Sequence, residues 1–143
     1  MVQDLSAVVT RISGPVHCRE VTREFDYASG RADLVGLGHK DRLHVFEAKL
    51  YKWRVALEQA RRNACFAHYC YVALPEQAAS SAVKARAEFQ RHGVGLLIIR
   101  GQEARLAIRP RRNVPWLTWL TRTALARLSP KLETGKHCHP VNL

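Results

Sequence analysis

The spacing of apolar positions changes several times along the chain, and each change marks an expected element. Apolar residues three and four positions apart predict a short helix within residues 1–13, which Gly14 and Pro15 end. Three stretches rich in β-branched and aromatic residues then predict strands, at residues 16–27, 31–37 and 42–50. Short polar turns separate these stretches, so we expect an antiparallel meander.

From residue 52 onward, strand-like alternation gives way to helices that are separated by apolar runs. The expected order is a helix at 52–67, a strand at 69–74, a helix at 76–92, a strand at 94–99 and an edge strand at 104–108. Strands that alternate with helices favour parallel pairing through right-handed crossovers. We therefore expect an α/β fold in which helices flank a mixed central β-sheet.

A strongly amphipathic helix is predicted after the sheet, from Pro115 to Leu128. Trp116 and Trp119 continue its apolar stripe, which favours a core position or an oligomer contact over stacking on bases. Residues 129–143 are polar and are expected to form a flexible tail. The preceding 128 residues are a suitable length for a single domain with one core.

Charge is the least ordinary part of the composition. The chain of 143 residues carries 23 Lys and Arg against 12 Asp and Glu, a formal net charge of +11. This excess favours a polyanionic partner, with nucleic acid first and an anionic membrane surface second. We expect no membrane span and no signal peptide, because neither pattern occurs, and hence a cytoplasmic protein. The four cysteines lack paired spacing, which favours free thiols over a zinc site.

Three charged residues interrupt the apolar strands of the meander. Asp33 lies on the second strand, and Glu47 and Lys49 share one face of the third. Two carboxylates and an ammonium on an apolar sheet are costly unless a cation or a substrate compensates them. Mg²⁺ is anchored by one or two carboxylates, and the carbonyl of Ala48 offers a further oxygen. Lys49 would orient or deprotonate a water, or offset charge on a phosphate. The alternative is a solvated pair on an edge strand.

Asp33, then Glu47-Ala48-Lys49, followed at once by a helix, resembles the motif of the PD-(D/E)XK nuclease superfamily. That group includes restriction endonucleases, junction resolvases and repair nucleases. The resemblance covers residues 20–108, with Ala32 in place of the motif's proline. It implies a restriction-endonuclease-like core and hydrolysis of phosphodiester bonds that depends on Mg²⁺ or Mn²⁺.

The resemblance also implies two more site residues. Gln59 stands where many members carry a glutamine that points into the site from the helix after the motif. Glu24 is the best candidate for a further acidic ligand, and Glu20 is second. Basic residues around the motif are expected to hold the nucleic-acid backbone: Arg31, Lys52, Arg54, Arg61, Arg62, Arg109, Arg111 and Arg112. Arg31 has the alternative of only flanking the Ser29-Gly30 turn.

Three functions are consistent with these patterns. The first is a Mg²⁺-dependent endonuclease that acts mainly on DNA, as a homodimer or with a partner subunit. The second is a nucleic-acid-binding module or subunit that keeps the fold without catalysis. The third is an interaction role for helix 115–128, with an anionic membrane or a protein, which rests only on its amphipathicity.

Overall fold

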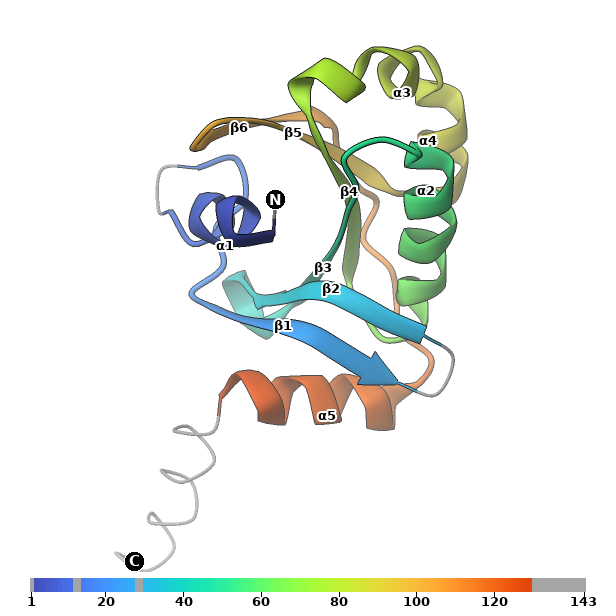
Figure 1. Ribbon diagram of the computed structural model, residues 1–143. Helices are drawn as coiled ribbons and strands as arrows, with labels where there is room; N and C mark the ends of the chain where they lie inside the picture. Colours follow the sequence, from blue (N-terminus) through green and yellow to red (C-terminus); the bar gives the residue numbers. More distant parts are fainter. Residues whose placement is uncertain (1, 12–13, 28–29, 130–143) are drawn as a thin grey trace, which may run out of the picture.

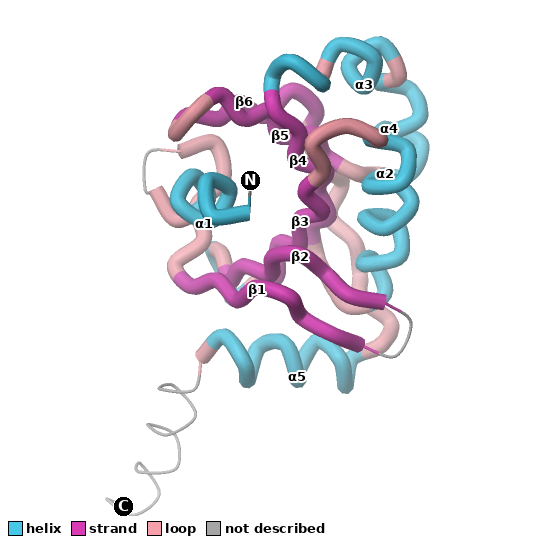
Figure 2. The backbone as a smooth tube through the Cα atoms, in the orientation of Figure 1, coloured by secondary structure: helices cyan, strands magenta, loops and turns pink. Residues whose placement is uncertain are grey.

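The strands of the sheet lie side by side in the order in which they occur in the chain. The computed structural model describes residues 2–11, 14–27 and 30–129 (Figure 1). Its six-stranded sheet consists of β1 (Glu20–Tyr27), β2 (Gly30–Leu37), β3 (Leu43–Ala48), β4 (Tyr69–Pro75), β5 (Gly95–Arg100) and β6 (Glu103–Ile108). β3, β4 and β5 run parallel, and every other neighbouring pair is antiparallel (Figure 2). The mixed sheet of the expected α/β fold is confirmed.

Helices cover both faces of this sheet. They are α1 (Val2–Val9), α2 (Trp53–Arg62), α3 (Ser80–Lys84), α4 (Arg86–His92) and α5 (Thr118–Leu128). α2 and α4 lie on one side of the sheet and α1 on the other, while α5 runs beneath the hairpin of β1 and β2 (Figure 1). The larger core joins α2, α4 and α5 to the odd-numbered side chains of β3, and the smaller core joins α1 to the even-numbered ones. This is the expected flanking of the sheet by helices.

The period-two alternation of β2 and β3 explains the two cores. Val35 and Val45 are opposite each other in the antiparallel register and both face the larger core. Leu34 and Phe46 are the neighbouring pair and face α1. The odd-numbered side of these strands therefore also carries Glu47, under the helices rather than at an exposed edge.

Two strand boundaries differ from the prediction by more than one residue. β1 begins at Glu20 rather than at residue 16, because residues 15–19 follow α1, where the Cys18 N–H donates to the Val9 carbonyl. β3 ends at Ala48 rather than at residue 50, although the Lys49 N–H still donates to the Ala73 carbonyl of β4. Apolar composition continues past the paired segment in both cases.

The expected helix at 76–92 is broken into a 3₁₀ turn (Glu76–Ala78), α3 and α4. Ala85 leaves the helical region of φ and ψ between the two α-helices. The break buries Ala82 and Phe89, while Arg86 is exposed and donates to the Ala107 carbonyl. Gly93 ends α4 in the left-handed conformation.

The C-terminal helix begins at Thr118, three residues after the predicted start at Pro115. The preceding residues are held in an extended path, in which the Trp116 and Leu117 N–H groups donate to the Cys65 carbonyl. Trp116 and Trp119 are 66% and 54% exposed, so the prediction of a core position is wrong for both. The expected tail at 129–143 lies outside the described residues from 130 onward.

Cys18, Cys65 and Cys70 are buried free thiols, and Cys138 lies beyond the described residues. Between residues 2 and 129, over the ranges described, no helix has the length and apolar character needed to cross a membrane.

Candidate active site

Asp33 and Glu47 come together where β2 and β3 end their pairing. Asp33 Oδ2 accepts a hydrogen bond of 2.9 Å from the Ala48 N–H, so the side chain of Asp33 reaches across to the residue after Glu47. The charge of Asp33 also raises the pKa of Glu47, and the charge of Lys49 lowers it. The structure thus brings together the Asp33, Glu47, Ala48 and Lys49 that the sequence predicted as a site.

Glu47 is only 1% exposed, so the alternative of a solvated pair on an edge strand is wrong for this residue. Its Oε2 accepts a hydrogen bond of 2.8 Å from the Asn63 side-chain amide. Burial raises the pKa of Glu47 to about 7, and the bond from Asn63 opposes this shift only in part. The carboxyl group therefore changes its protonation near neutral pH.

A short chain of hydrogen bonds holds Glu47 from the helix layer. The Tyr27 hydroxyl donates to Asn63 Oδ1 at 2.5 Å, and the Asn63 amide donates in turn to Glu47. Sequence reasoning missed both Tyr27 and Asn63. Asn63 stands four residues after Gln59, at the end of α2, and this spacing puts the two side chains on one helical face. That spacing was the available signal for Asn63.

Tyr27 reaches the site because β1 changes faces at Glu24. Val21 packs in the α1 core, whereas Phe25 and Tyr27 pack in the larger core, although regular alternation would put all three on one face. Glu24 lies between them with a φ of 53°, in the left-handed region that side chains other than glycine rarely adopt. This one backbone conformation turns Tyr27 toward Asn63.

Glu24 itself is exposed. The hydrogen bond to Asp26 is the main cause that raises the pKa of Arg31, and the charges of Glu24 and Asp33 raise it further. Within the described ranges, no three His, Cys, Asp or Glu side chains are grouped so that they could hold one metal ion. Asp33 and Glu47 therefore stand as a pair of carboxylates there, and the role of Glu24 as a further ligand stays a prediction.

Gln59 lines a small cavity of about 90 Å³ together with Tyr27, Gly30, Arg31 and Arg62. Its Oε1 is buried and accepts no hydrogen bond from the described part of the chain. A buried acceptor without a donor is costly, and such atoms are rare in folded proteins. This observation favours Gln59 as a residue that contacts a ligand.

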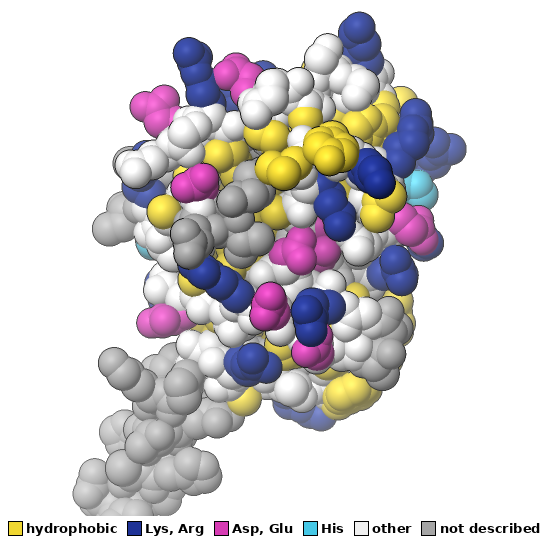
Figure 3. Space-filling model, in the orientation of Figure 1, with side chains coloured by type: hydrophobic (Ala, Val, Ile, Leu, Met, Phe, Trp, Pro, Cys, Tyr) yellow, Lys and Arg dark blue, Asp and Glu magenta, His cyan; other side chains and the backbone are white. Residues whose placement is uncertain are grey.

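Three of the arginines predicted to bind nucleic acid already have carboxylate partners. Arg31 pairs with Asp26 at 2.6 Å and Arg61 pairs with Glu58. The Arg54 guanidinium donates to both oxygens of Glu88 and lies 4.3 Å above the Trp53 ring. Acidic and basic side chains are accordingly interspersed on the face of the molecule in Figure 3.

The other predicted basic contacts are spread over several places. Arg62 lines the cavity beside Gln59, and Lys52 precedes α2 in the left-handed conformation. Arg111 packs over Gly93, and the charge of Arg112 lowers the pKa of His68. Arg109 lines a different cavity, on the opposite face of the sheet. The structure does not gather all eight residues into one surface around Asp33.

Comparison with known proteins identifies the fold alone. No family model matches the chain, and no curated protein matches it. Among solved structures, a protein of unknown function, SPO1766, from Silicibacter pomeroyi is similar with a TM-score of 0.64. The similarity covers 97% of this chain and 88% of that one, at 18% sequence identity. The arrangement of elements thus occurs in a solved protein.

Proposed function

We propose that this protein is a metal-dependent endonuclease that hydrolyses phosphodiester bonds, mainly in DNA, on a restriction-endonuclease-like core. The observation that carries the proposal is the proximity of the Asp33 and Glu47 carboxyl groups where the pairing of β2 with β3 ends, with Lys49 beside them. Burial and the charge of Asp33 both raise the pKa of Glu47. A bound cation at this position would lower the free-energy cost of ionising the Glu47 carboxyl group.

The donor set fits Mg²⁺ or Mn²⁺. Asp33 and Glu47 would hold the cation through carboxylate oxygens, and the Ala48 carbonyl would add another oxygen, which suits a hard ion that keeps several waters. When bound, such a cation polarises a phosphate and acidifies a water. The raised pKa of Glu47 supports the fit, because a proton and a cation would compete for the same buried carboxyl group.

The remaining residues have separate roles in this proposal. Lys49 would orient the attacking water or offset charge that develops on the phosphate. Gln59, whose Oε1 lacks a donor within the described residues, would accept a hydrogen bond from that water. Asn63 is a positioning residue that holds Glu47 through its amide. Arg62, beside Gln59, would contact the DNA backbone.

Cleavage of plasmid DNA tests the proposal directly. Wild-type protein with Mg²⁺ or Mn²⁺ is expected to nick supercoiled plasmid, and Asp33→Asn and Lys49→Ala are each expected to reduce the rate about 100-fold or more. Glu58→Gln is the matched control, since Glu58 is exposed on α2 and pairs with Arg61. Equal rates in wild type, Asp33→Asn and Lys49→Ala would refute the assignment.

Metal binding has a readout that needs no turnover. At pH 8, Mn²⁺ is expected to raise the melting temperature of the wild type, because binding to the folded state alone stabilises it. Glu47→Gln should lose most of this increase, while Glu58→Gln keeps it. An equal response of wild type and Glu47→Gln to Mn²⁺ would mean that the ion binds elsewhere.

A nucleic-acid-binding module without catalysis is the second candidate. Its support is that one oxygen of each carboxyl group already accepts a hydrogen bond from the protein, Asp33 from Ala48 and Glu47 from Asn63. Salt-sensitive DNA binding without cleavage under any divalent ion would favour this reading over the nuclease.

A further inference from the structure

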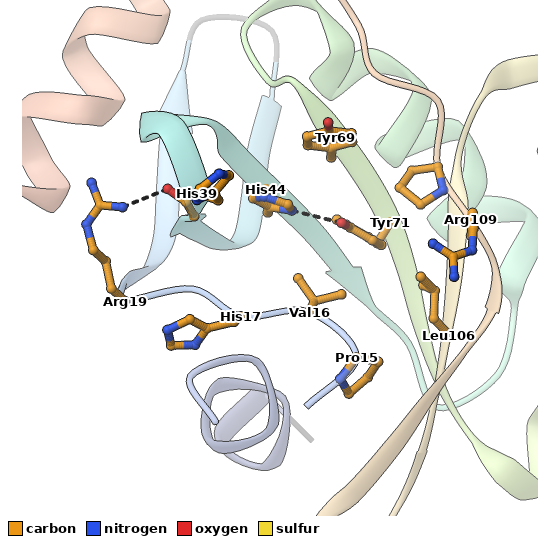
Figure 4. A pocket seen from close by; sticks show the side chains of 12 residues that line it. Pro15, Val16, His17, Arg19, His39, His44, Tyr69, Tyr71, Leu106 and Arg109 are labelled. Carbon is orange, nitrogen blue, oxygen red and sulfur yellow. Dashed lines mark hydrogen bonds between the residues drawn. The ribbon is translucent and has the colours of Figure 1, made fainter. Parts of the chain in front are cut away.

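A second and larger cavity, of about 500 Å³, opens on the face of the sheet opposite Glu47. The connection between α1 and β1 forms one wall, with Val16 and His17 (Figure 4). His44 of β3 and Tyr71 of β4 lie across from them, and Arg109, after β6, lies beyond Tyr71 (Figure 4). The volume is within the range of sites for small organic ligands, roughly 300–1,000 Å³.

Aromatic side chains form a rigid wall of this cavity. The His44 ring is nearly parallel to those of Tyr69 and Tyr71, with centroids 4.8 Å and 5.8 Å away. His44 Nδ1 and the Tyr71 hydroxyl share a hydrogen bond of 2.8 Å, and Phe46 stacks on Tyr71 at 4.6 Å. Burial lowers the pKa of His44 to about 4, so its imidazole is neutral at pH 7. The wall therefore offers apolar surface with polar edges and no charge of its own.

Two arginines lie at opposite sides of the cavity, and Arg109 carries the positive charge that no carboxylate of the described residues offsets. Arg19 donates to the Gly38 carbonyl at 2.7 Å and pairs with Asp41, which holds its guanidinium at the rim. Arg109 is exposed and has no carboxylate partner in the described part of the chain. None of the described residues that line the cavity is acidic. This charge pattern favours an anion.

We propose that this cavity binds a nucleoside phosphate, either a free nucleotide or the terminal nucleotide of an oligonucleotide. The aromatic and aliphatic walls suit a base and a sugar, and the polar edges of His44 and Tyr71 suit the hydrogen-bonding groups of a base. The planar guanidinium of Arg109 suits a phosphate, which it can bind through two hydrogen bonds. The site lies on the other face of the sheet from Asp33 and Glu47, and it needs no metal.

Titration calorimetry and amide chemical shifts in the presence of EDTA test this site. The probes are AMP, a 5′-phosphorylated dinucleotide, adenosine and inorganic phosphate. AMP is expected to bind and to shift amide signals of residues 16–19 and 106–109, while adenosine and phosphate alone bind about tenfold more weakly or worse. Asp33→Asn should bind AMP as the wild type does, which separates this site from the proposed nuclease.

Three variants locate the site. Arg109→Ala should weaken AMP binding about tenfold. Leu106→Trp, which fills the cavity from β6, should abolish binding. Arg105→Ala is the matched control, because Arg105 is exposed on the same strand but does not line the cavity. Since Arg109 is exposed, its variant is expected to fold, and a thermal melt checks this for all three.

The binding measurements on these variants and probes distinguish the proposed site from the alternatives. Loss of AMP binding in Arg109→Ala and Leu106→Trp but not in Arg105→Ala supports the site. Binding of the dinucleotide as tightly as AMP assigns the site to a chain end, and binding of AMP alone assigns it to a free nucleotide. The proposal is overturned by no shift at millimolar AMP, by AMP binding that both variants leave unchanged, or by inorganic phosphate that binds as tightly as AMP.

Discussion

At the scale of single residues, the proton on Glu47 links the site to folding. The pKa of Glu47 rises from 4.5 to about 7 in the folded protein, chiefly through burial. The folded state therefore binds this proton more tightly than the unfolded chain does. The contribution of this proton to the free energy of unfolding is fully present below about pH 4.5, and it is lost as the pH rises through about 7. By the conversion of pKa shifts to free energy, the loss is about 3 kcal/mol.

Glu47→Gln should remove this dependence. At pH 8 the free energy of unfolding of the variant is expected to exceed that of the wild type by up to about 3 kcal/mol. At pH 4.5 the two free energies should be nearly equal. Glutamine can still accept the hydrogen bond from Asn63. Urea denaturation at both pH values measures the difference, with Glu58→Gln as the exposed control. Parallel stability curves at all pH values would contradict the buried ionisation of Glu47.

Asn63→Ala should destabilise the fold by about 2–4 kcal/mol, because it leaves both the Tyr27 hydroxyl and the buried Glu47 without their partner. Asn113→Ala is a suitable comparison, since among the described residues the Asn113 side-chain amide makes only a long contact of 3.7 Å to Cys70 Sγ. Denaturation at pH 8 gives both values. Equal and small losses in the two variants would show that the amide of Asn63 does not support Glu47.

At the scale of elements, the sequence predicted what depends on local periodicity and missed what depends on tertiary contacts. Alternation along β2 and β3 predicted Asp33 and Glu47 on one face, and the register of the paired residues 34–37 and 43–46 is regular up to these two positions. The change of faces at Glu24 has no sequence signal, since glutamate rarely adopts a positive φ. The contact of Tyr27 with Asn63 depends on that change and was not predictable.

The break at Ala85 and the late start of α5 belong to the same class. Apolar periodicity continues through residues 76–92 and from Pro115 onward, so the sequence predicted single helices. Tertiary packing produced a different result in both places. The break at Ala85 lets both Ala82 and Phe89 reach the core. Before α5 begins, backbone N–H groups within residues 109–117 donate to the carbonyls of Gly93, His68 and Cys65. Propensity is a weak signal where such contacts compete with it.

Gly93 and Gly101 allow a comparison of two turns with similar backbones. Both have a positive φ, 69° and 60°, so alanine at either position should cost about 1 kcal/mol through backbone strain. A Cβ at Gly93 would also lie 2.8 Å from Arg111 Nη2 and 3.1 Å from Arg111 Cβ, whereas at Gly101 no atom of the described residues lies within 4 Å. Gly93→Ala should therefore lose more stability than Gly101→Ala in urea denaturation. Equal losses would mean that the segment after β6 moves away freely.

At the scale of the whole molecule, the charge of +11 predicts binding to DNA that weakens steeply with salt. The ion pairs of Arg31, Arg54 and Arg61 reduce what these residues can add. Arg112→Ala and Arg62→Ala are each expected to lower the slope of log K against log salt by about 0.9. Arg61→Ala should change it less, because Glu58 already neutralises that charge. Fluorescence anisotropy of labelled DNA, at salt concentrations from about 50 to about 300 mM, measures the slopes. Slopes that are equal in all three variants would contradict this division.

The agreement between strand order and chain order bears on how the protein is made. Each strand pairs with the strand just before it, so the sheet can grow from local contacts, which favours fast folding. The exception is α5, which packs against β1 and β2 from the far end of the chain. During synthesis at the ribosome, Phe25 can pack against Phe66 early, but the part of the first hairpin that α5 covers stays open to water until residues 118–128 have emerged. The nascent chain thus carries this uncovered surface until after β6 has been made.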